Sequence, residues 1–585
     1  MGLGILQAGG NAVDAAVTTA LCQGVMNPAA SGLGGGHFML VRTPGGEAEL
    51  VDAREVAPAA AHRDMFKGAL EGGRVEGWQR ACDGLVRRGN PAASVDGGLA
   101  VAVPLELKGL HLAHSRHGRL PWSKLFEPVI PVARSGFATH PFLVASISNI
   151  NTTLLSTYTE LRDAFFIRDK AAWRPPAVNE TCCARPALAQ VLEQGARVGV
   201  LRVQRRAHRG DLKKRECAGG LPRHDGTQRV FSLTASFLSN AVAQRGPDAL
   251  YKGALAKLLV ADVAAAGGIL TEADLSSAEA LVRPVARMEA LGLDLLVPPP
   301  PTSSLAVALA LRVLTSTRNW AACRSVEKIN QQLLTLLLSL ETHFCVPPTS
   351  PDYSLPLANS GSLGLHRTVE ALKHAAALRL NLGDPGPPGG EGEALAVSAV
   401  ADVAGEAYAA SLRRAIRDDQ VLDALAYGGS WNLSRAGARG DDHGTSHVNV
   451  VDAEGMAVSM TTTINLGFGS KVLSKSTGIL LNNQMDDFST PGQFNALNLP
   501  PSEKNFISPG KKPYSSMSPI IVEQGGRLRC VLGASGGPRI ISAVVQTLLR
   551  LWRVKAMRSC LRIGEPLFKA FFSRRTGPPQ FQRRG

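Results

Sequence analysis

An alternation of polar and apolar residues begins at residue 446 and predicts a β-hairpin. Successive side chains from Ser446 to Val450 fall on opposite faces of an extended segment, which is typical of a half-buried strand. The turn-forming run Asp-Ala-Glu-Gly follows at 452–455, and residues 456–463 predict the returning strand. A glycine and a threonine, Gly444 and Thr445, stand directly before the first strand.

Hydrophobic spacing elsewhere predicts a mixture of helices and strands. Residues 10–26 have apolar positions at helical spacing and end at an Asn-Pro pair, which predicts a buried helix that stops there. The glycine-rich run 32–36 and two strands joined at Gly45-Gly46 follow. Further helices are predicted at 105–135, 250–266, 303–314 and 366–382, and residues 445–545 are predicted to be rich in strands, with turns at 452–455 and 524–526.

The glycine run at 32–36 does not predict a phosphate-binding loop. A phosphate loop continues into Lys-Ser/Thr and a helix, whereas this run continues into a strand. The run predicts close packing of backbone segments instead. Irregular stretches are predicted at 69–97, 196–229 and 316–362, and a basic tail begins at about residue 552.

The charge of the chain is concentrated in two segments. The 585 residues carry a net charge of +15. Residues 197–229 hold ten Lys/Arg against three Asp/Glu, and residues 550–585 hold ten against one, so the rest of the chain is close to neutral. Neither segment has the spacing of a zinc finger or an RNA-binding sheet, and no nucleic-acid partner is predicted. No apolar run approaches the roughly 20 residues of a membrane helix, and no signal peptide is visible at the start.

Cysteine and histidine spacing predicts no metal site. Of the nine cysteines only Cys182 and Cys183 are close together. Asp442, His443 and His447 resemble a ligand cluster, but residues four apart are well separated where a strand begins. Three N-x-S/T triplets, at Asn151, Asn179 and Asn432, are glycosylation acceptors if the chain is secreted.

Three clusters of candidate residues lie downstream of Thr445. They are Thr463 with Asn465, the run NNQMDDF that contains Gln484 and Asp487, and Ser515-Ser516 followed by Gly536-Gly537. Taken singly, each cluster has a structural explanation as a loop cap or a turn. Thr445 itself has one as a turn residue before a strand.

Taken in order, these motifs resemble the γ-glutamyltransferase family of N-terminal nucleophile hydrolases. The matching set is GTSH, T-x-N, NNQMDDF, P-x-SSM and G-x-x-GG, preceded by GGNAVDAAV, GLGGGHF and DAREVAP. The resemblance implies an α/β fold of the four-layer αββα sandwich type. The chain departs from the family's pattern at insertions near 69–97, 196–229 and 316–362 and in the basic tail from about residue 552.

The resemblance implies that Thr445 is a nucleophile whose α-amine is freed by self-cleavage of the chain. A threonine hydroxyl needs a neighbouring base, and an N-terminal threonine carries one in its α-amine. The family obtains that amine by cutting the preceding bond, here Gly444–Thr445. Glycine at 444 leaves the attacked carbonyl uncrowded and tolerates a strained backbone. A large subunit 1–444 and a small catalytic subunit 445–585 are therefore expected.

The same resemblance assigns the remaining site residues. The backbone N–H groups of Gly536 and Gly537 are implied to form an oxyanion hole, and Thr463 to orient the Thr445 hydroxyl. Arg54, Ser515 and Ser516 are implied to bind the donor's α-carboxylate, and Asp487, with Asn465 and Gln484, its α-ammonium. From the residues alone, Arg54 is better explained by a surface salt bridge with Glu55 or another neighbour.

The expected substrates are glutathione and other γ-glutamyl compounds, with water, amino acids or dipeptides as acceptors and with no cofactor or metal. The family's place on the extracellular face of the plasma membrane, or secretion, is the expected location. Two alternatives stay open. One is a related acylase acting on β-lactam side chains, and the other is an inactive, uncut protein whose basic segments bind acidic surfaces.

Overall fold

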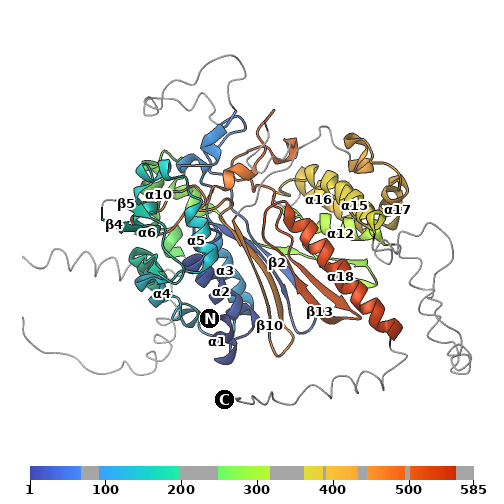
Figure 1. Ribbon diagram of the computed structural model, residues 1–585, viewed down its shortest axis with the longest axis horizontal. Coiled ribbons are helices and arrows are strands. Elements are labelled where there is room, and N and C mark those ends of the chain that lie inside the picture. Colours follow the sequence, from blue (N-terminus) through green and yellow to red (C-terminus); the bar gives the residue numbers. More distant parts are fainter. Residues whose placement is uncertain are drawn as a thin grey trace, which may run out of the picture.

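Two antiparallel sheets packed between helices form the body of the protein (Figure 1). The computed structural model describes residues 1–67, 91–170, 172–194, 196, 248–315, 361–386, 390–431, 444–493 and 501–561. Much of each predicted irregular stretch lies outside these residues, as does the chain after 561.

The first sheet joins the two ends of the sequence. Its strand order is β10-β11-β1-β2-β7, so a hairpin from the last third of the chain pairs directly with strands from the first tenth. The strands are β1 (Gly36–Arg42), β2 (Ala48–Ala53), β7 (Leu281–Pro284), β10 (Thr445–Val451) and β11 (Ala457–Thr463).

The second sheet lies against the first and has the order β13-β12-β9-β8. Its strands are β8 (Ala286–Ala290), β9 (Leu293–Val297), β12 (Ile520–Gln524) and β13 (Arg527–Leu532). The hairpin β12–β13 turns at Gly525-Gly526, where both glycines have positive φ. The predicted turns at 452–455 and 524–526 are therefore confirmed.

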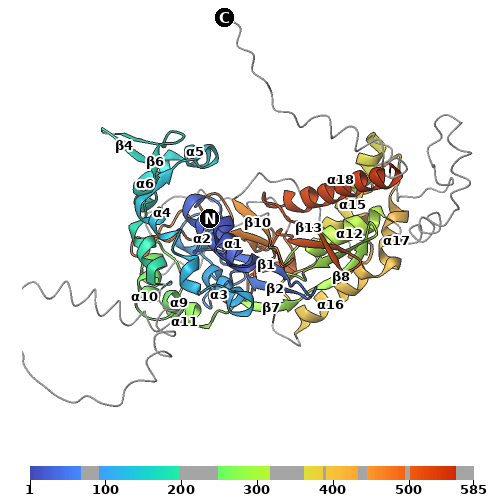
Figure 2. The same ribbon diagram turned by 90° about the horizontal axis from the view of Figure 1, so that it is seen from below.

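Helices cover the outer face of each sheet, which gives four layers (Figures 1 and 2). α2 (Ala12–Met26) and α3 (Glu106–His117) pack on the first sheet, with α1 (Gly2–Gln7) beside α2. α12 (Ser304–Leu314) packs on the second sheet and contacts α15 (Ser362–Leu380), α17 (Glu406–Ala415) and α18 (Arg539–Leu561). The expected αββα sandwich is confirmed.

The central strands are buried on both faces because they lie between two layers. Along β1, Phe38 and Leu40 belong to the core shared with the second sheet, whereas Met39 and Val41 belong to the core beneath α2 and α3. All seven residues of β11 are buried. This burial on both faces is typical of a strand in the middle of a sandwich.

The remaining elements surround these layers. They are α4 (Ile130–Ser135), α5 (Pro141–Ser148), α6 (Thr159–Phe165), α9 (Asp248–Tyr251), α10 (Ala254–Ala265), α11 (Glu272–Ser277), α16 (Glu391–Ala404) and the short strands β3 (Phe137–Ala138), β4 (Ile167–Asp169), β5 (Ala172–Arg174) and β6 (Thr181–Cys182). No single described helix is long and apolar enough to cross a bilayer. Only the pair α16 and α17, bent by 71°, reaches that length and composition.

Helices lie at the predicted positions, but some begin or end at other residues than predicted. α2 begins at a capping box, in which the Asn11 side chain accepts from the backbone of Asp14 and the Asp14 carboxylate accepts from Asn11 N–H. The predicted helix at 105–135 is divided in two, because α3 stops at Gly118 before Pro121. Residues from Arg539 onward form α18 rather than strand.

The glycine run 32–36 packs backbone against backbone, as predicted. A Cβ on Gly34 would overlap the Leu480 carbonyl, and one on Gly35 would overlap the carbonyl of Thr463. These contacts bring the loop before β1 against the end of β11, where the hairpin residues singled out in the sequence lie.

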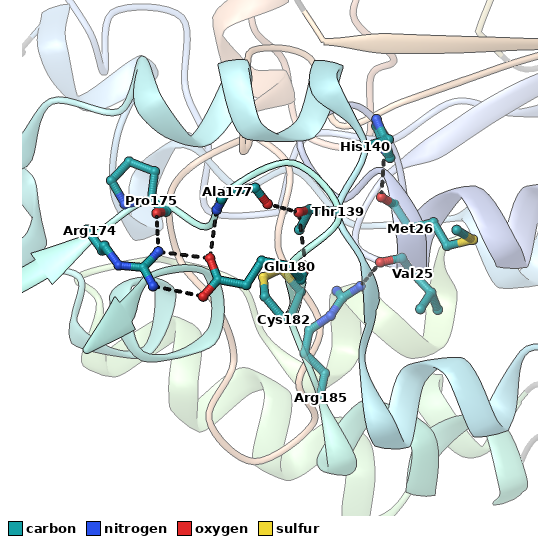
Figure 3. Close-up of a disulfide and its surroundings, with 11 residues drawn as sticks. Val25, Met26, Thr139, His140, Arg174, Pro175, Ala177, Glu180, Cys182 and Arg185 are labelled. Atoms are coloured by element: carbon teal, nitrogen blue, oxygen red, sulfur yellow. Dashed lines mark hydrogen bonds and ion pairs between the residues drawn. A yellow bond between two sulfur atoms is a disulfide. The ribbon is translucent and has the colours of Figure 1, made fainter. Parts of the chain in front are cut away.

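A disulfide joins the neighbouring residues Cys182 and Cys183, with sulfur atoms 1.97 Å apart (Figure 3). Around it, Arg174 makes a two-bond ion pair with Glu180, and Arg185 donates 2.8 Å hydrogen bonds to backbone carbonyls at the end of α2. The disulfide segment is thereby attached to the helical layer that covers the first sheet.

Candidate active site

The register of the hairpin brings Thr445 and Thr463 together. Thr445 is the first residue of β10 and pairs with Thr463, the last residue of β11. Their side-chain oxygens are 3.3 Å apart, within hydrogen-bonding distance. A turn at 452–455 therefore determines which hydroxyl faces Thr445.

The Thr463 hydroxyl also forms hydrogen bonds with two backbone groups. Its hydroxyl donates to the carbonyl oxygen of Gly444 at 2.9 Å and accepts from Asn465 N–H at 2.9 Å. A hydroxyl has one hydrogen, and Thr463 uses it on Gly444. Thr445 is therefore the donor in the contact between the two hydroxyls.

Gly444 lies where a larger residue would not fit. A Cβ at this position would be 2.5 Å from the carbonyl oxygen of Ala29, in the loop after α2. Gly444 does not have a positive φ, so its backbone conformation does not by itself require glycine. Glycine is needed here for close packing.

Arg54, directly after β2, is buried beneath the same site. Its side chain is fully buried, so the surface salt bridge considered from the sequence is wrong. Nε donates to the Pro513 carbonyl at 3.0 Å and Nη2 pairs with a carboxylate oxygen of Asp487. The contact with Glu55 is the longer one, at 3.4 Å.

Asp487 is the last residue of the 3-10 helix η7 (Gln484–Asp487), and one of its carboxylate oxygens, Oδ2, accepts hydrogen bonds from two side chains. Gln484 Nε2 donates to that oxygen at 2.6 Å, beside Arg54. Asn465, which has a positive φ of 75°, donates through its side chain to the Asn483 carbonyl at 3.0 Å. The loop after β11 is thus bonded to the loop that carries Asp487.

A pocket opens above these groups. Its walls carry hydroxyls, amides, one guanidinium and one carboxylate, together with two apolar side chains. The lining residues are Arg54, Thr445, Thr463, Asn465, Gln484, Asp487, Ser515, Ser516, Met517, Gly537 and Ile540. The structure therefore brings together all the predicted side chains, from positions up to 462 residues apart in sequence.

Gly536 and Gly537 lie between β13 and the first turn of α18. Both have positive φ, 115° and 55°. Their carbonyls accept from Arg539 and Ile540 N–H, so the two glycines lead directly into the helix. Gly537 lines the pocket, whereas Gly536 is not among the lining residues. Neither glycine N–H bonds to another described group.

Comparison with known proteins places this arrangement in a family. The gamma-glutamyltranspeptidase profile matches residues 1–215 and 233–559. Glutathione hydrolase 2 of Arabidopsis thaliana is 34% identical over 554 residues, which cover 94% of this chain and 75% of that protein. The chain belongs to the gamma-glutamyltranspeptidase family.

Solved structures support the family's N-terminal nucleophile hydrolase fold. Cephalosporin acylase from Bacillus halodurans has a TM-score of 0.61 at 18% identity, and the match covers 94% of this chain and 77% of that one. The Helicobacter pylori gamma-glutamyltranspeptidase has a TM-score of 0.50 at 21% identity, covering 75% of this chain and 94% of that one. At these identities the likeness concerns the fold alone.

Next to the pocket lies a buried acidic cluster that the sequence analysis missed. Burial raises the pKa of Glu55 to about 8, although the neighbouring Arg54 opposes the shift. Glu106 accepts from His37 at 2.8 Å and from Thr462 at 3.1 Å. Glu55 follows Arg54 directly, so its position in the sequence was the available signal.

Arg379 is a second residue that sequence reasoning missed. It lies behind the pocket and donates to Ser516 Oγ at 2.9 Å. The sequence feature that could have indicated Arg379 is its position as a charged residue near the end of a largely apolar helix. Met517 and Ile540, which line the pocket, had no distinguishing sequence pattern.

The metal candidates of the sequence analysis are only partly described. Asp442 and His443 lie outside the described residues. His447 bonds to Thr461 Oγ1 at 2.8 Å and Asn449 Oδ1 at 2.9 Å, and burial lowers its pKa to about 4. Its ring is therefore part of the hairpin's own hydrogen-bonding.

Proposed function

We propose that this chain is an autoprocessing γ-glutamyltransferase and glutathione hydrolase with Thr445 as its nucleophile. In the first step, Thr445 Oγ attacks the Gly444 carbonyl carbon, and the hydroxyl proton passes to the amide nitrogen. That nitrogen leaves as the α-amine of Thr445, so the peptide bond becomes an ester. Water then hydrolyses the ester. The products are a Gly444 carboxylate and a free Thr445 α-amine, which separate the subunits 1–444 and 445–585.

The observation that carries the proposal is the contact of Thr463 with both sides of the 444–445 bond. Its hydroxyl donates to the carbonyl that would be attacked, at 2.9 Å, and lies 3.3 Å from the attacking oxygen. A donor on a carbonyl stabilises the negative charge that develops there during attack. The same residue thus supports the nucleophile and the electrophile.

In the second reaction, the free α-amine of Thr445 takes the proton of its hydroxyl while the oxygen attacks a γ-glutamyl amide. The amine product leaves with a proton, and a γ-glutamyl ester of Thr445 remains. Water or an acceptor amine then breaks the ester. The unbonded N–H groups of Gly536 and Gly537, at the start of α18, are suited to an oxyanion.

The donor's amino acid end carries a carboxylate and an ammonium, and the pocket offers a partner for each. Arg54, Ser515 and Ser516 would bind the α-carboxylate, and Asp487, with Gln484 and Asn465, the α-ammonium. Arg54 and Asp487 pair with each other across the pocket wall. A zwitterion would replace that pair with two new ones, whereas a ligand with one charge would leave a buried partner unpaired.

N-terminal sequencing of the purified protein after denaturing electrophoresis tests the proposal. We expect a fragment that begins Thr-Ser-His in the wild type and a single uncut chain in Thr445→Ala. The cut protein is then assayed with γ-glutamyl-p-nitroanilide. An uncut wild-type chain would leave the family fold without the proposed chemistry and would favour the inactive alternative.

The β-lactam acylase alternative is less well supported. The likeness to cephalosporin acylase concerns the fold alone. The charged pair of Arg54 and Asp487 in the pocket suits a free amino acid end, whereas a uniformly apolar side chain would not use it. Release of a β-lactam side chain in place of γ-glutamyl hydrolysis would decide for the acylase.

We further propose an extracellular location, either secreted or at the outer face of the plasma membrane. Two of the three glycosylation triplets support this location, because Asn151 and Asn179 are exposed. Asn432 lies outside the described residues. A mobility shift on treatment with an N-glycan-removing enzyme, in protein from its native source, would support the proposal, and unmodified asparagines would oppose it.

A further inference from the structure

A buried arginine lies directly behind the two pocket serines. Arg379 is in the last turn of α15, where the negative end of the helix dipole favours a cation. Its Nη2 donates to Ser516 Oγ at 2.9 Å and its Nε donates to Ser303 Oγ at 3.1 Å. Arg379 is itself absent from the pocket wall.

Within the part of the chain that the structure describes, no carboxylate forms an ion pair with this guanidinium. Among the described residues, Arg379 takes part in no ion pair, although it is buried. Burial lowers its pKa, with favourable but weaker effects from Tyr514 and Asp487. A buried cation without a carboxylate partner is costly for folding, so its retention beside a pocket points to a ligand charge.

The hydrogen-bonding of Arg379 determines what Ser516 can do. Ser516 Oγ accepts from Arg379, and a guanidinium has no acceptor to offer in return. The hydroxyl hydrogen of Ser516 is bonded to none of the described groups. It is therefore free to donate into the pocket that Ser516 lines.

Ser515 is held as a donor in the same way. Its Oγ accepts from Met517 N–H at 3.1 Å, which again leaves the hydroxyl hydrogen for the pocket. Its carbonyl accepts from Ser303 Oγ at 2.6 Å, and Ser303 in turn accepts from Arg379. One guanidinium thus supports both serines, directly at Ser516 and through Ser303 at Ser515.

The ring of Tyr514 completes this support. The Arg379 guanidinium lies 5.2 Å from the ring centroid, within the range of a cation–π contact. Tyr514 is fixed at its other end by a 2.9 Å hydrogen bond from its hydroxyl to the Thr302 carbonyl. Residues 514, 515 and 516 are therefore all positioned by the same buried cation.

We propose that Arg379 is a positioning residue that makes Ser515 and Ser516 a donor pair selective for a carboxylate. Resting on the proposed function, this inference identifies the ligand feature as the free α-carboxylate of the γ-glutamyl donor. A donor hydroxyl and a nearby positive charge both favour an anion over a neutral amide. Arg379 should add no affinity for γ-glutamyl substrates whose α-carboxylate is amidated or absent.

The test compares two substrates in Arg379→Met, which keeps an unbranched side chain but removes the charge and the donors. For γ-glutamyl-p-nitroanilide we expect KM to rise about 10- to 100-fold, the usual effect of losing a hydrogen bond network to a charged group, with kcat changed much less. For the α-carboxamide analogue of the same anilide, KM should stay within about 3-fold of wild type. A merely structural role would raise both KM values alike.

Two further variants separate positioning from stability. Arg379→Lys keeps a charge and a donor and should recover part of the lost affinity for the α-carboxylate substrate. Arg185→Met is the matched control, because Arg185 is also buried and bonded to backbone carbonyls, at 2.8 Å. The control should lower thermal stability without changing the ratio between the two substrates.

Calorimetric titration with L-glutamate and 4-aminobutyrate, which lacks the α-carboxylate, does not depend on turnover. We expect the wild type to bind L-glutamate more tightly than 4-aminobutyrate. We expect Arg379→Met to lose most of this preference. If Arg379→Met does not fold, Ser516→Ala takes its place in the titration. L-Glutamate binding by a wild type that has no hydrolase activity would refute the proposed function alone. The role of Arg379 would be overturned if the enzyme is active and both variants keep the preference for L-glutamate. It would also be overturned if the wild type does not prefer L-glutamate over 4-aminobutyrate.

Discussion

The hydroxyl oxygens of Thr445 and Thr463 lie 3.3 Å apart at the open end of one hairpin, and Thr463 also donates to the carbonyl before Thr445. The two threonines are directly opposite in the strand register. The bond that we propose to be cut is therefore held on both sides by one residue. The geometry of this pair leads to the first prediction.

Replacing Thr463 with valine should slow cleavage of the 444–445 bond. Valine keeps the shape of threonine but removes the donor to the Gly444 carbonyl, and loss of one such donor typically costs about 100- to 1000-fold in rate. The rate is measured by gel electrophoresis of freshly made precursor. Thr463→Ser keeps the hydroxyl and should cleave close to the wild-type rate, and equal rates in both variants would contradict the role of the hydroxyl.

Gly444→Ala should fold poorly around the cleavage site. Its Cβ would lie 2.5 Å from the Ala29 carbonyl oxygen, and overpacking of this kind costs about 1–3 kcal/mol. We expect a lower melting temperature and slower cleavage. Gly467→Ala is the control, because a Cβ there meets nothing within 4 Å, and it should change neither quantity.

Asp487→Asn should weaken both the fold and donor binding. It leaves the buried Arg54 guanidinium without its main charge partner, and breaking a buried pair costs about 3 kcal/mol or more. Urea unfolding should show the loss, and KM for a γ-glutamyl substrate should rise. The exposed pair Lys252–Asp248 provides the contrast, since Asp248→Asn should cost less than about 0.5 kcal/mol.

Glu55 should make stability depend on pH. Its pKa is raised from 4.5 to about 8 by burial, so it stays protonated in the folded protein at pH values where the unfolded chain has lost that proton. The stability contributed by this group therefore falls as pH rises from about 4.5 to 8. Glu55→Gln removes the titration.

We expect the melting temperature of Glu55→Gln, relative to wild type, to increase between pH 5 and pH 8, as measured by scanning fluorimetry. A constant difference across that range would show that Glu55 does not titrate there. The variant keeps an acceptor for Arg54, so the comparison isolates the proton rather than the hydrogen bond.

The hairpin and several helices could be predicted from local sequence. Alternation at 446–450, the turn at 452–455 and the capping residue Asn11 depend on neighbours within a few positions. The division of 105–135 was missed because helical spacing continued weakly through Gly118 and Pro121. The start of α18 was missed because an apolar run in a buried layer fits either a strand or a helix.

The chemical identity of the site could be read from ordered motifs, but the partners of its charges could not. Arg54 is followed by Glu55 in sequence, yet its main carboxylate partner is Asp487, 433 residues away. Gly444 is in close contact with Ala29, a residue 415 positions away that no neighbouring residue indicates. Both facts depend on how loops from distant strands meet.

By itself, the sequence determined the family, the candidate nucleophile and the strand register that pairs Thr445 with Thr463, because a hairpin turn acts over a short range. Only the tertiary structure decided which charges are buried, which hydroxyls are left to donate and that Arg379 stands behind Ser515 and Ser516. The reason is physical. Burial and hydrogen-bond direction arise from the packing of layers, and no local pattern of residues specifies them.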